Sequence, residues 1–149
     1  MTMPRPNELP ADLGRSATYL MVRLGKHAQA SFTAGIEPLG LRPPHYDMLV
    51  TLAAGMASSQ KDLSDVLRVD QARLVALLDE MEEAGFVTRS QDPADRRRNI
   101  VVLTKEGERV VARGRRIAAD VERELVPLKG SQREEFTAML RRLVDTARD

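Results

Sequence analysis

Three consecutive arginines, Arg96, Arg97 and Arg98, are the side chains of this sequence best suited to bind a polyanion. They stand in the stretch SQDPADRRRN, whose composition favours a loop. A loop cannot bury three guanidinium groups, so they are available for phosphates or for the negative minor groove of DNA. Asp95 lies two residues before Arg97 and could hold it in one rotamer. A triple arginine is also common as a solvated patch, so this stretch alone does not establish a function.

A helix predicted to begin after Asp70 carries the second candidate surface. Its buried stripe is indicated by four residues at i, i+3, i+4 and i+7: Leu74, Leu77, Leu78 and Met81. The first turns of the opposite face are small, polar or basic. The last turns carry carboxylates that phosphates would repel: Asp79, Glu80, Glu82 and Glu83. Only the N-terminal half can therefore enter a major groove, as recognition helices do.

Five residues of that N-terminal half are expected to meet DNA. Ala72 and Ala76 are small enough to let the backbone approach the groove. Gln71 and Arg73 can pair with base edges or phosphates, and Val75 can touch a thymine methyl group.

The elements around these residues form a recognisable order. Ser59 and Asp62 are spaced as a capping box at the start of a preceding helix, and Ser59 is included in the expected DNA surface. Arg68-Val69 is long enough only for a turn. Gly85 ends the second helix, and apolar runs at 86–89 and 100–103 flank the arginine loop as two strands. Each feature is common by itself, but their combination predicts a winged helix-turn-helix.

This order of elements resembles the MarR family of bacterial transcription regulators. The most specific part is Asp92-Pro93-x-Asp95-Arg96-Arg97, followed by Val-Leu-Thr-x-x-Gly at 102–107. The resemblance covers nearly the whole chain. It implies a homodimeric repressor that binds a palindromic operator in double-stranded DNA and is released by a small ligand. It also implies that Asp95 and Arg97 are the carboxylate–arginine pair of the wing, with Arg97 at the minor groove.

The composition fits this interpretation. At 149 residues the chain suits one compact domain, with or without dimerisation arms. Hydrophobic residues make up 42% and aromatic residues 3%, so the core must be mostly Leu, Val, Ala and Met. The net charge is only +1, but residues 86–116 hold 9 basic and 4 acidic side chains. A local positive patch indicates docking at one face rather than general coating of nucleic acid.

No catalytic or metal-binding pattern is present. The chain has no Cys and two His, and it lacks a Gly-rich phosphate loop, a His pair at metal spacing and a nucleophile elbow. The carboxylates at 79–83 could be mistaken for an acid–base site, but Asp79 and Glu83 lie on the outer helix face, which favours a solvated surface. We therefore expect no enzyme activity, no cofactor and no metal.

The sequence also predicts a soluble, cytoplasmic protein without membrane contacts. No apolar run approaches the ~20 residues needed to cross a bilayer. Pro4, Pro6 and Pro10 interrupt any helix of a signal peptide.

Amphipathic helices are predicted on both sides of the winged helix-turn-helix. The first covers residues 12–34 and is expected to stop at Gly35 and the Pro38-Leu39-Gly40 turn. The others are the stretch from Pro43 to Gly55, residues 105–126 after a Thr104 cap, and a last helix opened by a Ser131–Glu134 capping box. The predicted fold is mainly α with a small β-hairpin wing. Its expected parts are an N-terminal arm and dimerisation helix (1–36), the DNA-binding module (37–104) and the C-terminal dimerisation helices (105–149).

Two alternatives remain open at this point. The terminal helices either form a homodimer whose recognition helices lie about one DNA turn, ~34 Å, apart, or pack on the module of a monomer. The module itself is either a DNA reader or a winged helix used for protein contacts, without sequence-specific DNA binding.

The resemblance also implies an effector cleft between the dimerisation helices and the DNA-binding module. The first two long helices could bring Arg23, His27, Phe32 and Tyr46 to such a cleft. Arg23 would favour a small anionic, aromatic ligand. Each residue also has an ordinary role open to it, in the core or on the surface.

Overall fold

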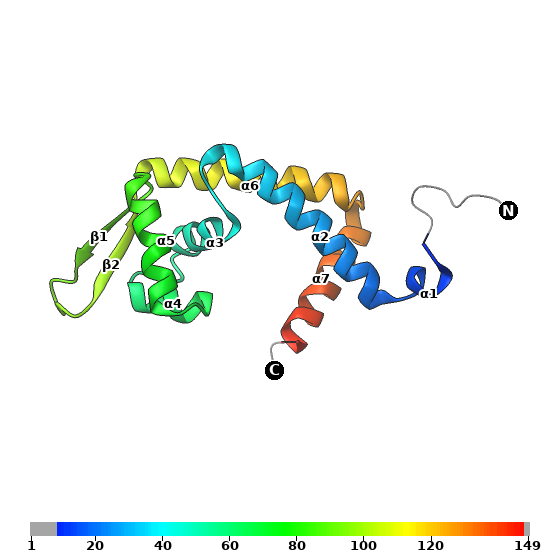
Figure 1. Cartoon of the computed structure of the whole chain (residues 1–149), viewed down its shortest axis with the longest axis horizontal. Helices are drawn as coiled ribbons and strands as arrows, with labels where there is room; N and C mark the ends of the chain where they lie inside the picture. Colours follow the sequence, from blue (N-terminus) through cyan, green and yellow to red (C-terminus); the bar gives the residue numbers. More distant parts are fainter. Residues whose placement is uncertain (1–8, 148–149) are drawn as a thin grey trace. The chain divides into compact units, whose positions relative to one another are not determined.

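The computed structural model describes residues 9–147 and divides the chain into two compact units. Among the described residues, 9–30 and 119–147 form one unit and 31–118 form the other. Two helices, α2 (Ala17–Ile36) and α6 (Lys105–Leu125), each contribute to both units (Figure 1).

The second unit is a winged helix-turn-helix, as predicted. It holds α3 (Pro43–Ala53), α4 (Gln60–Leu67), α5 (Gln71–Glu83) and an antiparallel hairpin of β1 (Val87–Gln91) and β2 (Asn99–Leu103). In the hairpin register, Val87 pairs with Leu103 and Gln91 with Asn99. The hairpin projects from one side of the unit (Figure 1). The core is aliphatic; its fully buried side chains include Ile36, Leu41, Met48, Leu49, Leu63, Leu74, Leu78 and Val111.

Side-chain caps fix both helices of the helix-turn-helix. Ser59 Oγ accepts a hydrogen bond from the Asp62 amide, and the Asp62 carboxylate accepts from the Ser59 amide, which is the predicted capping box. Asp70 Oδ1 accepts from the Arg73 amide at 2.9 Å and caps α5. All four residues of the predicted stripe of α5 are buried: Leu74, Leu77, Leu78 and Met81.

The start of α6 is joined to the turn between α5 and β1. Thr104 Oγ1 donates to the Gly85 carbonyl at 2.6 Å and accepts from the Gly107 amide at 3.0 Å, so it caps α6 as predicted. Gly107 lies directly against the Phe86 carbonyl, where a Cβ would overlap the oxygen. A glycine is therefore required for this approach of helix to backbone.

The N-terminal helix differs from the prediction of one helix over residues 12–34. A short α1 (Ala11–Gly14) ends first, and α2 begins at Ala17 because Ser16 Oγ accepts from the Tyr19 amide at 3.2 Å. Gly35 does not stop α2, since it lies within the helix against the Ile117 side chain. The chain turns instead through the 3₁₀ helix η1 (Glu37–Leu39) and Gly40, whose φ is 74°.

The first unit contains α1, the outer parts of α2 and α6, and α7 (Gly130–Thr146). The predicted capping box at Ser131 and Glu134 is wrong: α7 begins earlier, with Lys129 at the N-cap position and no side-chain cap. Arg133 pairs with Glu122 at 2.8 Å and ties α7 to α6. No residue of α7 is buried. Within residues 9–147, no helix has the length and apolar character of a membrane span.

We expect Gly107→Ala to destabilise the protein by about 1–3 kcal/mol, because the new methyl group must displace backbone at Phe86 in a packed region. Denaturant unfolding monitored by circular dichroism measures the change. Arg113→Ala, at an exposed position of the same helix, is the control and should leave stability within about 0.5 kcal/mol. Equal stability of the two variants would show that the close approach of Gly107 to the Phe86 carbonyl does not require a glycine.

Candidate nucleic-acid interface

The wing loop, residues 92–98, is closed by its own backbone and two aspartates. The Asp92 amide donates to the Arg98 carbonyl and the Arg98 amide to the Asp95 carbonyl, both at 2.9 Å. Asp92 Oδ1 accepts from the Ala94 amide at 2.8 Å, and Asp95 Oδ1 from the Arg97 amide at 3.0 Å. These bonds fix the loop without using any arginine side chain for its closure.

The three wing arginines are not equivalent in the structure. Arg96 and Arg97 are exposed, and their side chains form no hydrogen bond or ion pair within the described residues. Arg98 pairs with Asp62 of α4 at 3.4 Å. The prediction that Asp95 holds the Arg97 side chain is wrong: the Asp95 carboxylate accepts a hydrogen bond from the Arg97 backbone amide instead. The guanidinium of Arg97 therefore stays available to a ligand.

The first turns of α5 present the predicted residues to solvent. Gln71, Ala72, Arg73 and Ala76 are exposed, and Val75 is half-buried. Ser59 does not lie on the surface expected to meet DNA, because its exposed fraction is 1% and its hydroxyl takes part in the capping box. Ser59 shapes the surface rather than forming part of it.

The carboxylate half of α5, residues 79–83, is anchored to β1 by one arginine. Arg89 on β1 reaches Asp79 Oδ1 and Glu82 Oε2, each at 2.6 Å, and its backbone amide donates to Glu82 Oε1 at 3.1 Å. The side-chain bonds from Arg89, together with the bond from its amide, hold the pKa of Glu82 below its ordinary value. These carboxylates are therefore not simply solvated, as the sequence suggested, but connect the recognition helix to the wing.

A second anchor joins the same half of α5 to α3. Glu80 Oε2 lies 2.6 Å from the Arg42 guanidinium and 2.7 Å from Nε2 of His45. His45 is 3% exposed, and its Nδ1 accepts from the Arg42 amide at 3.0 Å. This bond leaves Nε2 as the protonated nitrogen of neutral His45, which donates to Glu80. Burial lowers the pKa of His45, although the hydrogen bond to Glu80 opposes the shift.

The wing is also bonded directly to the helix-turn-helix. The Val101 amide on β2 donates to the Ser58 carbonyl at 3.0 Å, and Ser59 forms an isolated antiparallel bridge with Ile100. The segment before α4 is thus joined to β2 by one backbone hydrogen bond and one isolated bridge. Recognition helix and wing are consequently parts of one bonded structure.

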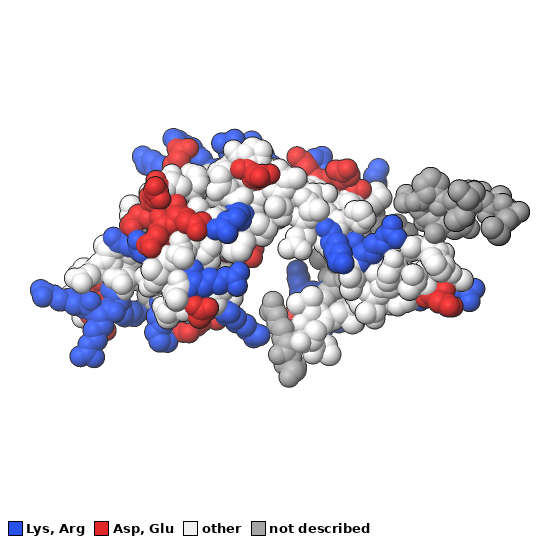
Figure 2. Space-filling model, in the orientation of Figure 1, with Lys and Arg blue, Asp and Glu red and all other residues white. Residues whose placement is uncertain are grey.

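Basic and acidic side chains lie in different parts of the second unit. Figure 2 shows basic side chains at the free end of the hairpin and an acidic group over the end of α5, where Asp79, Glu80 and Glu82 pair with Arg89 and Arg42. A polyanion that approaches the wing loop and the first turns of α5 avoids this acidic group.

The four predicted effector residues fall in different units. Phe32 and Tyr46 belong to the second unit and contact each other edge to face, with ring centroids 5.0 Å apart. Arg23 and His27 belong to the first unit, one helical turn apart on α2. A shared effector site for the four remains a prediction.

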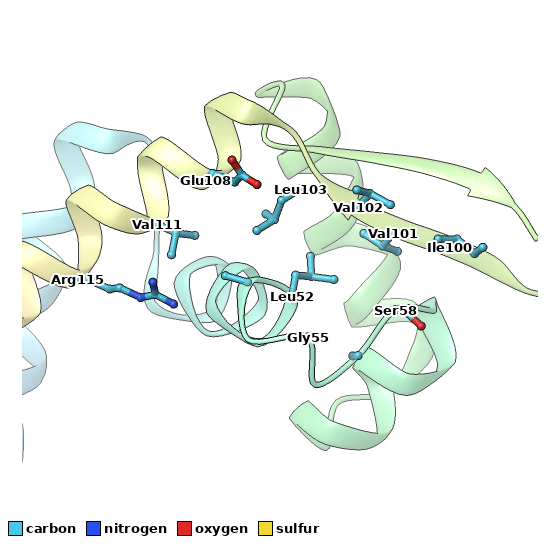
Figure 3. Close-up of a pocket in the computed structure, with 12 residues that line it drawn as sticks. Leu52, Gly55, Ser58, Ile100, Val101, Val102, Leu103, Glu108, Val111 and Arg115 are labelled. Atoms are coloured by element: carbon cyan, nitrogen blue, oxygen red, sulfur yellow. The ribbon is translucent and has the colours of Figure 1, made fainter.

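A pocket of about 500 Å³ lies elsewhere in the second unit (Figure 3). The end of α3, strand β2 and the start of α6 form its walls, which are mainly aliphatic: Leu52, Val101, Leu103 and Val111. Glu108 and Arg115 are its charged residues, and none of the four predicted effector residues lines it. It can accept a small apolar group with an ionic substituent.

The anchoring roles of His45 and Arg89 were not predicted from the sequence. A weak signal existed for Arg89, since a cation seven residues after Glu82, across a glycine turn, is within reach of the helix end. No signal in the sequence pairs His45 with Glu80, which is 35 residues away. Among the described residues, no cluster of His, Asp and Glu suits a metal ion.

Comparisons with known proteins agree on one family. A sequence model of the MarR family matches residues 39–98. The transcriptional regulator HosA of Escherichia coli O111:H- is 33% identical over 106 residues, which cover 70% of this chain and 78% of HosA. The transcriptional repressor Rv2887 of Mycobacterium tuberculosis strain H37Rv is 30% identical over 127 residues, 84% of this chain and 91% of that protein.

A solved structure is similar along almost the whole chain. It is that of the transcriptional repressor CouR bound to a 23-mer DNA duplex. The two structures superpose with a TM-score of 0.79 at 26% sequence identity, over 93% of this chain and 99% of CouR.

We expect the stability of this protein to fall as pH drops below about 6.5, the ordinary pKa of histidine. The pKa of His45 is lower in the fold than in the unfolded chain, so the unfolded chain binds the proton more readily and acid favours unfolding. Unfolding free energies measured between about pH 7.5 and 5.5, above the main carboxylate range, follow this change. His45→Gln should flatten the slope, whereas exposed His27→Gln should keep it. Equal slopes in both variants would contradict the assignment.

Proposed function

The chain belongs to the MarR family of transcriptional regulators, and we propose that it binds a specific double-stranded DNA sequence as a homodimer and represses transcription until a small ligand releases it. Such a protein acts on the chromosome, which places it in the cytoplasm.

The observation that carries the DNA-binding proposal is the pair of exposed wing cations, Arg96 and Arg97, in the same unit as the first turn of α5, which carries no carboxylate. Within residues 9–147, Arg96 and Arg97 have no internal partner, and the loop bonds through Asp92 and Asp95 keep them at the tip. The bond from Val101 to Ser58 holds the wing against the helix-turn-helix. In this arrangement α5 would enter a major groove while the wing reaches the adjacent minor groove. CouR, which shares this fold, is bound to a duplex in its structure and supports the proposal.

The homodimer proposal rests on apolar surface in the first unit. Large hydrophobic residues of α2 and α7 are 38–53% exposed: Leu20, Met21, Val22, Leu24, Met139, Leu140, Leu143 and Val144. Helices with this much exposed apolar surface need a partner, and most homo-oligomers are two-fold dimers. We propose that segments 1–36 and 105–149 form the dimer around modules 37–104, so that the operator is palindromic with half-sites about one DNA turn apart.

Selection of bound duplexes from a random pool tests the whole proposal. A palindromic consensus is expected, with apparent affinity falling steeply between about 50 and 200 mM salt because each neutralised phosphate releases counterion. Absence of enrichment at low salt would overturn the proposal and favour a winged helix used for protein contacts.

For effector control we propose a small anionic aromatic ligand. The supporting features are the Phe32–Tyr46 aromatic pair, the cation Arg23 and the polar side chain of His27. The ligand must bind the DNA-free state more tightly than the DNA-bound state, because equal affinity for both states shifts nothing.

Replacing Arg97 with alanine is expected to weaken binding to the selected operator several-fold and to lower the slope of log affinity against log salt by about one. The reason is that the Arg97 side chain is a cation without a hydrogen bond or ion pair in residues 9–147, whereas the bond from its backbone amide to Asp95 is kept by alanine. Fluorescence anisotropy across a salt series measures both quantities. Arg116→Ala, which removes an exposed cation from α6, should match the wild type in both. Unchanged binding of Arg97→Ala would remove the wing from the mechanism.

Aromatic monocarboxylates, beginning with benzoate, are expected to raise Tm and to release the operator. Arg23→Gln should abolish both effects, because it removes the proposed partner of the carboxylate. Arg115→Gln is the control for the pocket between α3, β2 and α6 and should respond like the wild type. The opposite pattern would move the effector site to that pocket, and no response in any protein would exclude this ligand class.

A further inference from the structure

The turn between α4 and α5 contains a backbone conformation that arginine rarely adopts. Arg68 has φ 53° and ψ 42°, in the left-handed region, and donates its amide to the Ser64 carbonyl at the end of α4. Within residues 9–147 it is the only residue other than glycine with positive φ. Glycine fills this conformation without strain and asparagine with little, so an arginine here weakens the turn.

The fold makes no use of the Arg68 side chain. It is exposed, and no hydrogen bond or ion pair to it occurs within the described residues. The nearby charges are engaged elsewhere: Lys61 pairs with Asp65 at 3.0 Å, and Asp70 caps α5. A cation at the end of α4 interacts favourably with the helix dipole, but a residue better suited to the conformation would fit the turn at less cost. Backbone strain at an exposed, unpaired residue indicates a role outside the fold.

The position of Arg68 indicates that role. It lies two residues before the Asp70 cap, at the N-terminal end of α5, where Gln71 and Arg73 are also exposed. A long cationic side chain beside a helix that enters a major groove can reach the phosphates at the groove edge. We propose that Arg68 binds a DNA backbone phosphate and fixes how the recognition helix sits on the duplex. This inference rests on the proposed DNA-binding function.

A phosphate contact and a base contact by Arg68 would affect DNA affinity differently. A phosphate contact strengthens binding to every duplex by a similar factor and contributes to the salt dependence, because one more counterion is released. A structural role for Arg68 would instead appear as lower stability after its replacement. Substitution by glycine separates the two, since it removes the cation and relieves the backbone at once.

The experiment compares Arg68→Gly, Arg68→Asn and Arg68→Lys with the wild type, and Arg113→Gln as a charge-matched control on α6. Tm is measured for each, and affinity for the selected operator and for one unrelated duplex across a salt series. The glycine and asparagine variants should bind both duplexes several-fold more weakly, with a log–log salt slope lower by about one and a Tm no lower than that of the wild type. The lysine variant and the control should keep the wild-type slope.

Wild-type affinity and slope in Arg68→Gly and Arg68→Asn would overturn the inference while leaving the proposed function intact. Loss of binding to the operator alone, with the unrelated duplex unaffected, would also overturn it, because it indicates a base contact. A wild-type protein that binds no duplex would instead refute the proposed function itself. Asparagine tolerates the left-handed conformation, so it gives the same readout if the glycine variant folds poorly.

Discussion

The orientation of α5 depends on ion pairs made by its carboxylate half. Arg89 holds Asp79 and Glu82 against β1, while Arg42 and His45 hold Glu80 against α3. The buried stripe of α5 sets which face points inward, but apolar packing alone allows a helix to slide or tilt. Directional, charge-assisted bonds to two different elements restrict that freedom. Within the described residues, the exposed side chains of the leading half of α5 form no hydrogen bond or ion pair and are available for recognition: Gln71, Ala72, Arg73 and Ala76.

The different roles of the two halves of α5 explain why a helix proposed to bind DNA carries several carboxylates. Four carboxylates on a helix proposed to meet a polyanion look unfavourable, yet three of them neutralise cations within the unit. Cations without an internal partner among the described residues lie in the wing loop and at the beginning of α5. Charge neutralised inside the fold at one end of the helix thus coexists with free cations at the other, although the net charge of the chain is only +1.

Local signals in the sequence predicted most of the fold. The Ser59 and Asp70 caps, the stripe of α5, the hairpin and the Thr104 cap all follow from residues close together in the chain, and all are confirmed. The predictions that were wrong also concerned local signals. Gly35 was expected to stop a helix, but its smallness serves the approach of Ile117 from 82 residues away. No local pattern distinguishes these two uses of glycine.

The candidate site was predictable only where it is exposed. The exposure of the wing arginines and of the small and polar residues at the start of α5 could be predicted from residue type, because these side chains face solvent and need no partner elsewhere in the chain. The anchoring of Glu80 by His45 and the burial of Ser59 depend on contacts between distant elements and could not be read in this way.

Each edge of the two-stranded sheet has one backbone amide engaged near its middle. On β1, the outward amide of Arg89 donates to Glu82, and on β2 the outward amide of Val101 donates to Ser58. Open strand edges are templates on which other chains add strands and aggregate. A wing must project from its protein, and here the central amide that an added strand would use is already bonded on each edge, by a side chain on β1 and by the segment before α4 on β2. The same bonds that hold the hairpin therefore disfavour the addition of a strand at the middle of either edge.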